Sequence, residues 1–288
     1  MTTTLSGLVR ECVGLLRAGN IENERFEAEQ IVLKCCSADV RDLIMYPERE
    51  VAPEQETLVR ECVSRRLSGE PLQYILGEWE FCGLLFYVGD GVLIPRQDTE
   101  TLAELALEYI RGRRQKRLLA ADLCAGSGCI GISLAVLGGA DVTLVELSDR
   151  AAEYLRRNIA HHGVGGRCTV VQADVLSEDT AGRLPMFDLI VTNPPYLTGQ
   201  DMKQLQREVT YEPEMALYGG EDGLDFYRRM LPLWSKRLNP GGMFAAEIGM
   251  GQEKDVMQIF EECGLAAHYR RDMCGVIRVI YGIKNGGK

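Results

Sequence analysis

Apolar side chains recur at helical spacing through the first 70 residues. Intervals of three and four residues, which place side chains on one face of a helix, dominate three stretches. The apolar positions are Leu5, Leu8, Val9, Cys12, Val13 and Leu16, then Phe26, Ile31, Val32 and Cys35, and finally Leu58, Val59, Cys62, Val63 and Leu67. Pro53 suits the first turn of the third helix, and Gly69 and Pro71 end it. We therefore predict a small helical-bundle domain over 1–70, which either docks a protein substrate or only stabilises the chain.

The pattern becomes strand-like between Gln73 and Val88. Aromatic and β-branched residues lie on both sides of Cys82-Gly83, as in a β-hairpin. We expect 71–92 to form a hairpin linker that leads into a larger domain, 93–288. A stiff segment around Pro95 opens that domain, and Asp98 is expected to cap a helix over 99–111.

Beyond Arg117, short apolar runs alternate with amphipathic helical segments. Strands are predicted at 118–123, 141–145, 168–172, 187–191, 243–248, 266–269 and 276–283, with helices at 130–137, 149–161 and about 224–238. The turn 239–242 should deliver the fifth strand, and the last two strands are too close for a helical crossover, so they should be antiparallel. The alternation predicts a doubly wound, mostly parallel, seven-stranded α/β sheet of the Rossmann-like kind. Ligands of such sheets bind outside the carboxyl ends of the strands.

A glycine-rich loop follows the first strand of this sheet. Gly126, Gly128 and Gly131 form a G-x-G-x-x-G pattern, and Glu146 lies 20 residues after Gly126, at the end of the next strand. Glycines allow backbone to approach a ligand closely, and an acid at that place accepts hydrogen bonds from ribose hydroxyls. The pattern by itself suits NAD as well as S-adenosylmethionine.

Two further acids bear on that choice. Asp122, just before the glycine turn, can pair with the amino group of a methionyl moiety but would repel a pyrophosphate. The alternative is that Asp122 only accepts loop N–H bonds. Asp174 follows the third strand, where it can meet an adenine amino group while Val175 packs on the ring. The alternatives are that Asp174 is a helix cap or a solvated turn acid, and that Val175 is an ordinary core residue.

The fourth strand ends in Asn193-Pro194-Pro195-Tyr196. Two prolines can continue neither a sheet nor a helix, so the chain should leave the strand in a rigid, extended turn. The side-chain carbonyl of Asn193 and the backbone carbonyl of Pro194 are then two converging acceptors for a planar NH₂ group, and Tyr196 offers an aromatic face. A plain polar turn is the competing interpretation. The complete string at a strand end favours a functional site.

Composition limits the classes of partner and site. The net charge of −10 disfavours a nucleic-acid-tracking surface. The ten cysteines include no Cys-x-x-Cys pair, and the three histidines are not at ligand spacing from them, so no metal site is predicted. We find neither a signal-peptide pattern nor an apolar run of about 20 residues, and we expect a cytoplasmic protein with reduced thiols that does not act at a membrane.

With the glycine loop, Glu146, Asp174 and Asn-Pro-Pro-Tyr in this order, the chain resembles the class I S-adenosylmethionine-dependent methyltransferases. More narrowly, it is similar to the release-factor glutamine methyltransferase family over nearly its whole length, including the Leu93-Ile94-Pro95-Arg96 and Tyr211-Glu212-Pro213 segments. Gln97 stands where the family usually has a second proline, which loosens that loop slightly. Cys124 stands where many members have glycine, which requires that the backbone there need no positive φ.

The resemblance implies an enzyme that transfers a methyl group from S-adenosylmethionine to the side-chain amide nitrogen (N5) of the glutamine in the Gly-Gly-Gln motif of peptide-chain release factors, modulating translation termination. S-adenosylhomocysteine would be the other product. The implied catalytic residues are Asn193, Pro194 and Tyr196, with Pro195 joining them in substrate binding. The implied cofactor-binding residues are Asp122, Cys124, Ala125, Gly126, Ser127, Gly128, Glu146, Asp174, Val175 and Asn193.

Other functions use parts of the same pattern. An adenine-amino (N6) DNA or RNA methyltransferase also acts on a conjugated NH₂ group, but is expected to carry a basic recognition domain. An NAD-dependent dehydrogenase leaves Asn-Pro-Pro-Tyr unexplained, and a non-catalytic cofactor-binding module has no use for Asn193. The sequence therefore favours the glutamine methyltransferase.

Overall fold

The computed structural model describes residues 3–113 and 117–285. Residues 1–2, 114–116 and 286–288, which belong to the predicted ranges 1–70 and 93–288, lie outside the described residues. The chain divides into two compact units. Unit 1 comprises Met1–Glu78 and Gln206–Tyr211, and unit 2 comprises Trp79–Leu205 and Glu212–Lys288.

Unit 1 contains the predicted helical bundle. Its helices are α1 (Leu5–Ala18), α2 (Glu24–Cys35), α3 (Val40–Met45), α4 (Pro53–Leu67) and α5 (Leu72–Leu76). The apolar stripes pack against one another, so that Leu5, Leu8, Ile31 and Val59 are fully buried. A buried ion pair joins Glu27 to Arg66 at 2.5 Å.

The segment 206–211 belongs to unit 1 although it lies far along the chain. Glu208 forms a second ion pair with Arg66, and the hydroxyl of Tyr211 donates to the carbonyl of Ser68 at 3.1 Å. The ion pair is buried on the Arg66 side, so it is screened less than a surface pair. Unit 1 is therefore completed by a piece of the loop that follows the Asn-Pro-Pro-Tyr turn.

The predicted hairpin consists of β1 (Glu78–Phe81) and β2 (Leu84–Tyr87). Cys82 and Gly83 both have positive φ, at 51° and 73°, which closes the two-residue turn. The amide of Asn158 accepts the N–H of Tyr87 at 2.8 Å and donates to its carbonyl at 3.1 Å. The hairpin, which belongs to unit 2 from Trp79 onward, is thus held against the rest of that unit.

Unit 2 is the predicted seven-stranded sheet, with strand order β5-β4-β3-β6-β7-β9-β8. The strands are β3 (Leu119–Leu123), β4 (Asp141–Glu146), β5 (Cys168–Gln172), β6 (Phe187–Thr192), β7 (Leu238–Glu247), β8 (Leu265–Arg271) and β9 (Ile277–Lys284). The strands from β5 to β7 pair in parallel, and β9 pairs antiparallel with both β7 and β8. Winding reverses between β3 and β6, which is where an open α/β sheet binds ligands.

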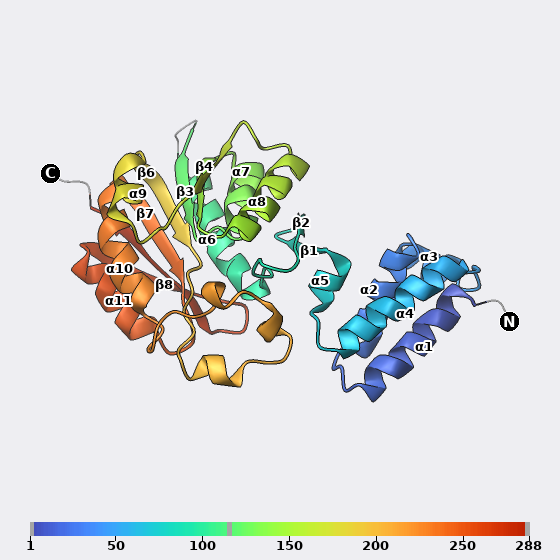
Figure 1. Cartoon of the computed structure of the whole chain (residues 1–288). Helices are drawn as coiled ribbons and strands as arrows, with labels where there is room; N and C mark the ends of the chain where they lie inside the picture. The colour runs from blue at the N-terminus through green and yellow to red at the C-terminus, as the bar shows by residue number, and fades with distance from the viewer. Residues whose placement is uncertain (1–2, 114–116, 286–288) are drawn as a thin grey trace. The chain divides into compact units, whose positions relative to one another are not determined.

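Helices cover both faces of the sheet (Figure 1). They are α6 (Gln97–Gly112), α7 (Cys129–Gly138), α8 (Asp149–His161), α9 (Glu178–Arg183), α10 (Asp225–Trp234) and α11 (Glu253–Glu262), with short turns η1 (Asp201–Gln204), η2 (Val209–Tyr211), η3 (Glu214–Ala216) and η4 (Ser235–Arg237). One core includes Leu102, Ile132 and Leu155 from α6, α7 and α8, and the other includes Trp234 and Phe260 from α10 and α11. The sheet is therefore buried on both sides.

Several local predictions were wrong. The stretch from Gln73, predicted to be strand-like, begins within helix α5, and the first hairpin strand starts only at Glu78. Helix α6 begins at Gln97 with Arg96 as its N-cap, so Asp98 lies inside the first turn and instead pairs with Arg278 at 2.6 Å. The helix predicted to reach 238 ends at Trp234 and tightens into η4. The predicted turn 239–242 lies within β7 as a bulge, because the pairing partner of β6 jumps from Leu238 to Met243.

Candidate active site

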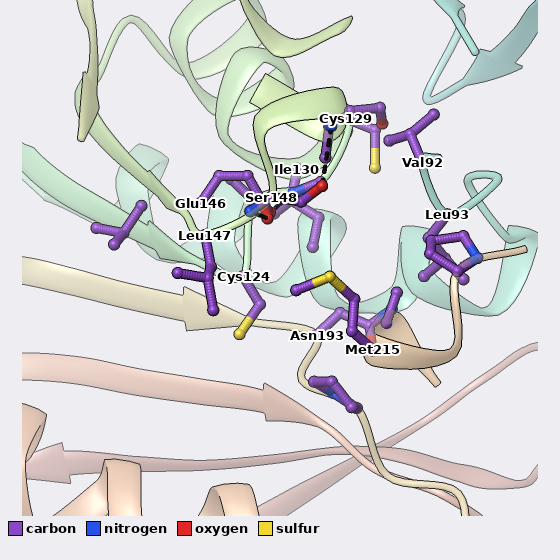
Figure 2. Close-up of a pocket in the computed structure, with 18 of the residues that line it drawn as sticks. Val92, Leu93, Cys124, Cys129, Ile130, Glu146, Leu147, Ser148, Asn193 and Met215 are labelled. Carbon is purple, nitrogen blue, oxygen red and sulfur yellow. Dashed lines mark hydrogen bonds between the residues drawn. The ribbon is translucent and has the colours of Figure 1, made fainter. Parts of the chain in front are cut away.

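A cavity of about 210 Å³ lies at the carboxyl ends of β3, β4 and β6, entirely within unit 2. Figure 2 shows Glu146 and Leu147 on one side of it, Val92 and Leu93 on the other, and Asn193 between. It is lined by Gly91, Val92, Leu93, Ile94, Pro95, Arg96, Thr99, Cys124, Ala125, Gly126, Ser127, Cys129, Ile130, Val145, Glu146, Leu147, Ser148, Ala151, Asp174, Val175, Leu176, Asn193, Pro195, Pro213, Met215, Ala216 and Phe226. Nine of the predicted site residues are in this lining; Asp122, Gly128, Pro194 and Tyr196 are not.

The glycine loop reaches the cavity through left-handed backbone. Cys124, Gly126 and Gly128 have φ of 60°, 55° and 82°. The expectation that Cys124 needs no positive φ was therefore wrong. The N–H of Ala125 donates to the carbonyl of Val145 at 3.1 Å, and this bond fixes the path of the turn. Cys124 therefore adopts the left-handed conformation, which glycine would adopt at lower cost.

The three glycines of the fingerprint serve different purposes. A Cβ added to Gly126 would meet nothing within 4 Å, so this backbone borders open space. At Gly128 it would come within 2.4 Å of Leu155, and at Gly131 within 2.8 Å of Leu144. Gly126 therefore keeps backbone accessible at the cavity, whereas the other two permit close packing of α7.

Glu146 lies at the end of β4, lines the cavity and is mostly buried, with 8% of its surface exposed. One carboxylate oxygen accepts the N–H of Gly126 at 2.7 Å, and the other accepts the N–H of Ser148 at 2.7 Å. Each oxygen keeps further acceptor capacity. The residue both tethers the glycine loop and presents a carboxylate to the cavity.

Asp122 is fully buried in β3. Its Oδ2 accepts the N–H of Gly131 at 2.8 Å, as expected if Asp122 serves to bind backbone N–H groups. Its Oδ1 has no hydrogen-bond partner among the described residues. Burial raises the pKa of this carboxyl to about 7, opposed by the Gly131 hydrogen bond and reinforced by the charge of Glu146. An unpartnered acceptor beside the loop has capacity for a cation or a proton.

Asp174 is exposed at the cavity edge and Val175 is buried in the lining. Asp174 Oδ1 accepts the N–H of Leu176 at 2.8 Å, and the carbonyl of Val175 accepts from the indole of Trp234 at 2.8 Å. These two bonds fix the turn after β5. One oxygen of Asp174 is left over for a ligand.

The Asn-Pro-Pro-Tyr turn leaves β6 immediately after Thr192. Asn193 and Pro195 line the cavity, and Asn193 Nδ2 donates to the hydroxyl of Thr99 at 3.3 Å. No described N–H donates to the Pro194 carbonyl. Tyr196 lies outside the lining, with its hydroxyl 3.3 Å from Oε1 of Glu247.

Sequence reasoning missed Thr99 and Glu247. Glu247 ends β7 and is 1% exposed, and its Oε2 has no hydrogen-bond partner among the described residues. Burial raises its pKa to about 7, while the nearby hydroxyls of Thr99 and Tyr196 and the charge of Arg278 oppose that rise. The available sequence signal was an acid near the carboxyl end of the predicted apolar strand 243–248, a position like that of Glu146 after its own strand.

Glu212 is a third residue that was not among the predicted site residues. It is buried, accepts the N–H of Ile94 at 3.0 Å and forms an ion pair with Arg96. It therefore joins the two sequence segments, around Ile94 and around Pro213, that border the cavity.

Other kinds of site are not formed by the residues that the structure describes. Within 3–113 and 117–285, no cluster of three or more His, Cys, Asp or Glu side chains could hold a metal ion. The ten cysteines are free thiols. Over the same ranges, no helix combines the length and apolar character needed to cross a membrane.

The chain is similar to known proteins along both units. Family models described as PrmC N-terminal domain and Methyltransferase small domain match residues 8–77 and 98–220. A release factor glutamine methyltransferase of Geobacter sulfurreducens is 40% identical, covering 93% of this chain and 93% of its own. A relative of the same name from Moorella thermoacetica is 38% identical, with 91% of each chain covered.

Solved structures are similar in fold. The hMettl16 catalytic domain in complex with MAT2A 3′UTR hairpin 1 has a TM-score of 0.54 at 14% identity, covering 90% of this chain and 95% of that chain. At this identity the likeness concerns the architecture of the sheet and helices alone.

Proposed function

This chain belongs to the release factor glutamine methyltransferase family, whose members methylate protein glutamine, and we propose that its substrate is the glutamine of the Gly-Gly-Gln motif in peptide-chain release factors. Methylation at the amide nitrogen N5 would modulate translation termination, and it would take place in the cytoplasm, where release factors act. The observation that carries the proposal is Asn193 at the cavity, with its amide nitrogen held by Thr99 and its carbonyl oxygen left to accept from a substrate NH₂ group.

The cavity fits S-adenosylmethionine as the methyl donor. Open space over Gly126 would admit the cofactor against the loop Cys124–Gly128, Glu146 would accept hydrogen bonds from the ribose hydroxyls, and Asp174 with Val175 would hold the adenine. Asp122 lies outside the cavity lining, and its unpartnered Oδ1 would meet the amino group through a bridging water. When bound, the cofactor supplies a methyl group already activated by positive charge on sulfur. No serine, histidine or cysteine nucleophile is then required.

The chain's own task is to orient the substrate amide. An amide nitrogen is a weak nucleophile because its lone pair is delocalised into the carbonyl. Hydrogen bonds from its two N–H groups to Asn193 Oδ1 and the Pro194 carbonyl would hold the plane of the group and favour pyramidal nitrogen as the bond to carbon forms. Pro195 and Tyr196 keep the turn rigid beside it. The proton leaves nitrogen after transfer, so no strong base is needed beforehand.

A nucleic-acid adenine could offer the same kind of NH₂ group. The net charge of −10 opposes tracking along phosphates, and the relatives that match over both units are named for release factor glutamine. The two substrates are separated by experiment. Full-length protein and S-adenosylmethionine should add one methyl group to a release factor, located by mass spectrometry on the Gly-Gly-Gln glutamine. A release factor with Gly-Gly-Ala should stay unmodified, as should adenine-containing DNA and RNA; methylated nucleic acid with unmodified release factor would overturn the proposal.

We also assign substrate docking to the helical unit. Helix α3 has no buried residue, and it exposes Ile44 at 74% and Met45 at 64%. Such apolar exposure suits a protein partner. In the full chain, Ile44→Glu with Met45→Glu should raise KM for intact release factor without changing the rate on a short Gly-Gly-Gln peptide. Leu137→Glu, also at an exposed apolar position but on α7, is the matched control. If the double variant had an unchanged KM for intact release factor, the helical unit would have a stabilising role only.

A further inference from the structure

The backbone of the Asn-Pro-Pro-Tyr turn has few hydrogen-bond donors of its own. Its two prolines carry no N–H, so neither can fasten the turn by donating a backbone bond. The peptide unit between Tyr196 and Leu197, which follows, is instead held on both edges. Its N–H donates to the carbonyl of Leu217 at 2.9 Å, and its carbonyl accepts from Nε2 of Gln252 at 3.0 Å. The turn therefore leads directly into a fixed peptide plane.

Gln252 uses both ends of its side-chain amide. It is half-buried at the start of α11, and its Nε2 donates to the carbonyl of Gly223 at 3.3 Å as well as to that of Tyr196. Its Oε1 accepts the N–H of Gly249 at 2.9 Å. The reverse orientation would set Oε1 against two carbonyl oxygens, so only one orientation of the amide makes these bonds. Gln252 thus links the Asn-Pro-Pro-Tyr turn to the loops that precede α10 and α11.

Two glycines let the neighbouring backbone approach the turn closely. A Cβ on Gly219 would come within 2.6 Å of the carbonyl oxygen of Pro195 and of Tyr196 Cα. A Cβ on Gly223 would come within 2.3 Å of the Tyr196 carbonyl oxygen. Because proline also fixes its own φ, few soft torsions remain between the two ends of the turn. A displacement at its Tyr196 end would therefore be passed on to the proposed substrate acceptors.

We propose that Gln252 is a positioning residue for methyl transfer. By holding the Tyr196 carbonyl it sets the place of the Pro194 carbonyl, one of the two proposed acceptors for the substrate amide, so the inference rests on the proposed function of the turn. Gln252 is not in the lining of the cofactor cavity, and it acts through the turn. It lines a second cavity, of about 590 Å³, together with Tyr196. Water from this cavity could donate to the Tyr196 carbonyl but, unlike a side chain anchored on α11, would not hold it in place.

The first test removes only the donor. In Gln252→Glu a carboxylate still accepts the N–H of Gly249 but cannot donate to the two carbonyls. Gln258→Glu, the same change at an exposed position of α11, is the matched control. In single-turnover methylation at saturating cofactor and release factor, we expect Gln252→Glu to lose at least about tenfold in rate and Gln258→Glu to match the unmodified chain. Cofactor affinity, measured by calorimetry, should change less than about threefold in both. A wild-type rate in Gln252→Glu would overturn the inference.

The second test is a recovery of rate, which separates positioning from a loss of stability. Gln252→Met keeps the length of the side chain and removes all three bonds, so it should be slow at every pH. In Gln252→Glu a protonated carboxyl can donate one bond again. Its rate relative to Gln252→Met should therefore rise by at least about twofold as pH falls from about 8 to about 5.5, and a constant ratio would overturn the inference. Both variants keep the charged residues that line the second cavity, whose titration cancels in the ratio: Asp201, Asp222, Arg228, Asp255 and Arg278.

A third measurement does not depend on the substrate. The Leu197 N–H belongs to the peptide unit whose carbonyl Gln252 holds, so its exchange with solvent, followed in nitrogen-labelled protein, reports on that plane. We expect exchange at least about tenfold faster in Gln252→Glu than in the unmodified chain, and no change in Gln258→Glu. Equal exchange in all three proteins would overturn the inference even if release factor is methylated. Faster exchange in Gln252→Glu, with no methylation of release factor by the unmodified chain, would instead contradict the proposed function and leave Gln252 as the residue that holds the turn.

Discussion

The carboxylate of Glu146 accepts the backbone N–H of Gly126 at 2.7 Å, joining the end of β4 to the glycine loop that follows β3. The proposed ribose acceptor is thus also a structural tether. Its second bond, to the N–H of Ser148, lies at the start of α8. Loss of this side chain should therefore affect the ligand and the loop together.

We expect Glu146→Ala to weaken S-adenosylmethionine binding by about 1–3 kcal/mol, the scale of a hydrogen bond to a charged group. Glu146→Gln keeps one acceptor oxygen and should lose less. Isothermal calorimetry measures both affinities, and Tm shows whether the loop tether contributes to stability. Wild-type affinity in Glu146→Ala would exclude Glu146 from the cofactor site.

Asn193 should matter more to turnover than to cofactor affinity. Asn193→Ala removes one of two acceptors for the substrate amide, so we expect a loss of roughly 10²-fold or more in single-turnover rate. Asn193→Asp keeps an acceptor but adds a negative charge that stabilises the cationic ground state more than the transition state, where charge is dispersed, and should also be slow. A wild-type rate for Asn193→Ala would show that the Asn-Pro-Pro-Tyr turn has no catalytic role.

Asp122 should make folding stability depend on pH. Burial raises the pKa of its carboxyl from 3.8 to about 7 in the folded chain, so the folded state holds this proton more tightly than the unfolded state. Its stabilising contribution is present below pH of about 4 and is lost as pH rises through about 7. Urea unfolding at pH 5 and pH 8 should show a larger loss of stability for the unmodified chain than for Asp122→Asn. Glu247 adds a loss of the same sign in both proteins, so it does not affect the comparison. Parallel pH dependences would show that Asp122 keeps an ordinary pKa.

Replacing Cys124 by glycine should relieve the backbone strain at this position. Its φ of 60° costs a residue with a Cβ about 1–2 kcal/mol. Cys124→Ala keeps that cost and loses the thiol, whereas Cys124→Gly loses the thiol and removes the cost. We expect Cys124→Gly to be more stable than Cys124→Ala by about 1 kcal/mol in urea unfolding. If Cys124→Ala were the more stable variant, packing of the side chain would contribute more to stability than relief of the strained backbone.

Cys35 and Cys62 should form a disulfide under mild oxidation. Their sulfurs lie 3.7 Å apart on α2 and α4, and the hydrogen bond donated by the Cys35 thiol lowers the pKa of Cys62. A Cys62 thiolate can attack oxidised glutathione, releasing one reduced glutathione; Cys35 then displaces the second and closes the bond. Mass spectrometry should find a loss of two hydrogens, absent in Cys35→Ser. Oxidation that links other cysteine pairs at equal yield would contradict this assignment.

The strands and most of the helices, in their order, could be predicted from the residues alone, whereas α5, α9 and α11 were not predicted. The 3.6-residue periodicity of the first 70 residues and the short apolar runs after residue 117 follow from which side chains avoid water, and these patterns survive into the structure with shifts of a few residues at their ends. Local chemistry also located the chain segments of the site. Glycines, an acid after a strand, and paired prolines after an asparagine each have physical consequences that do not depend on distant residues.

Tertiary structure decided what those segments contact. Thr99 and Asn193 are 94 residues apart, and Ile94 and Glu212 are 118 apart, so no local pattern relates them. Cys124 adopts positive φ because the strand before it and the helix after it determine the path of the loop, whatever the residue prefers. Asp122 and Glu247 have raised pKa values because the whole sheet and its helices exclude water from them. Burial and long-range hydrogen bonding arise only when the chain is folded, and they decide which of the polar residues apparent in the sequence can act together.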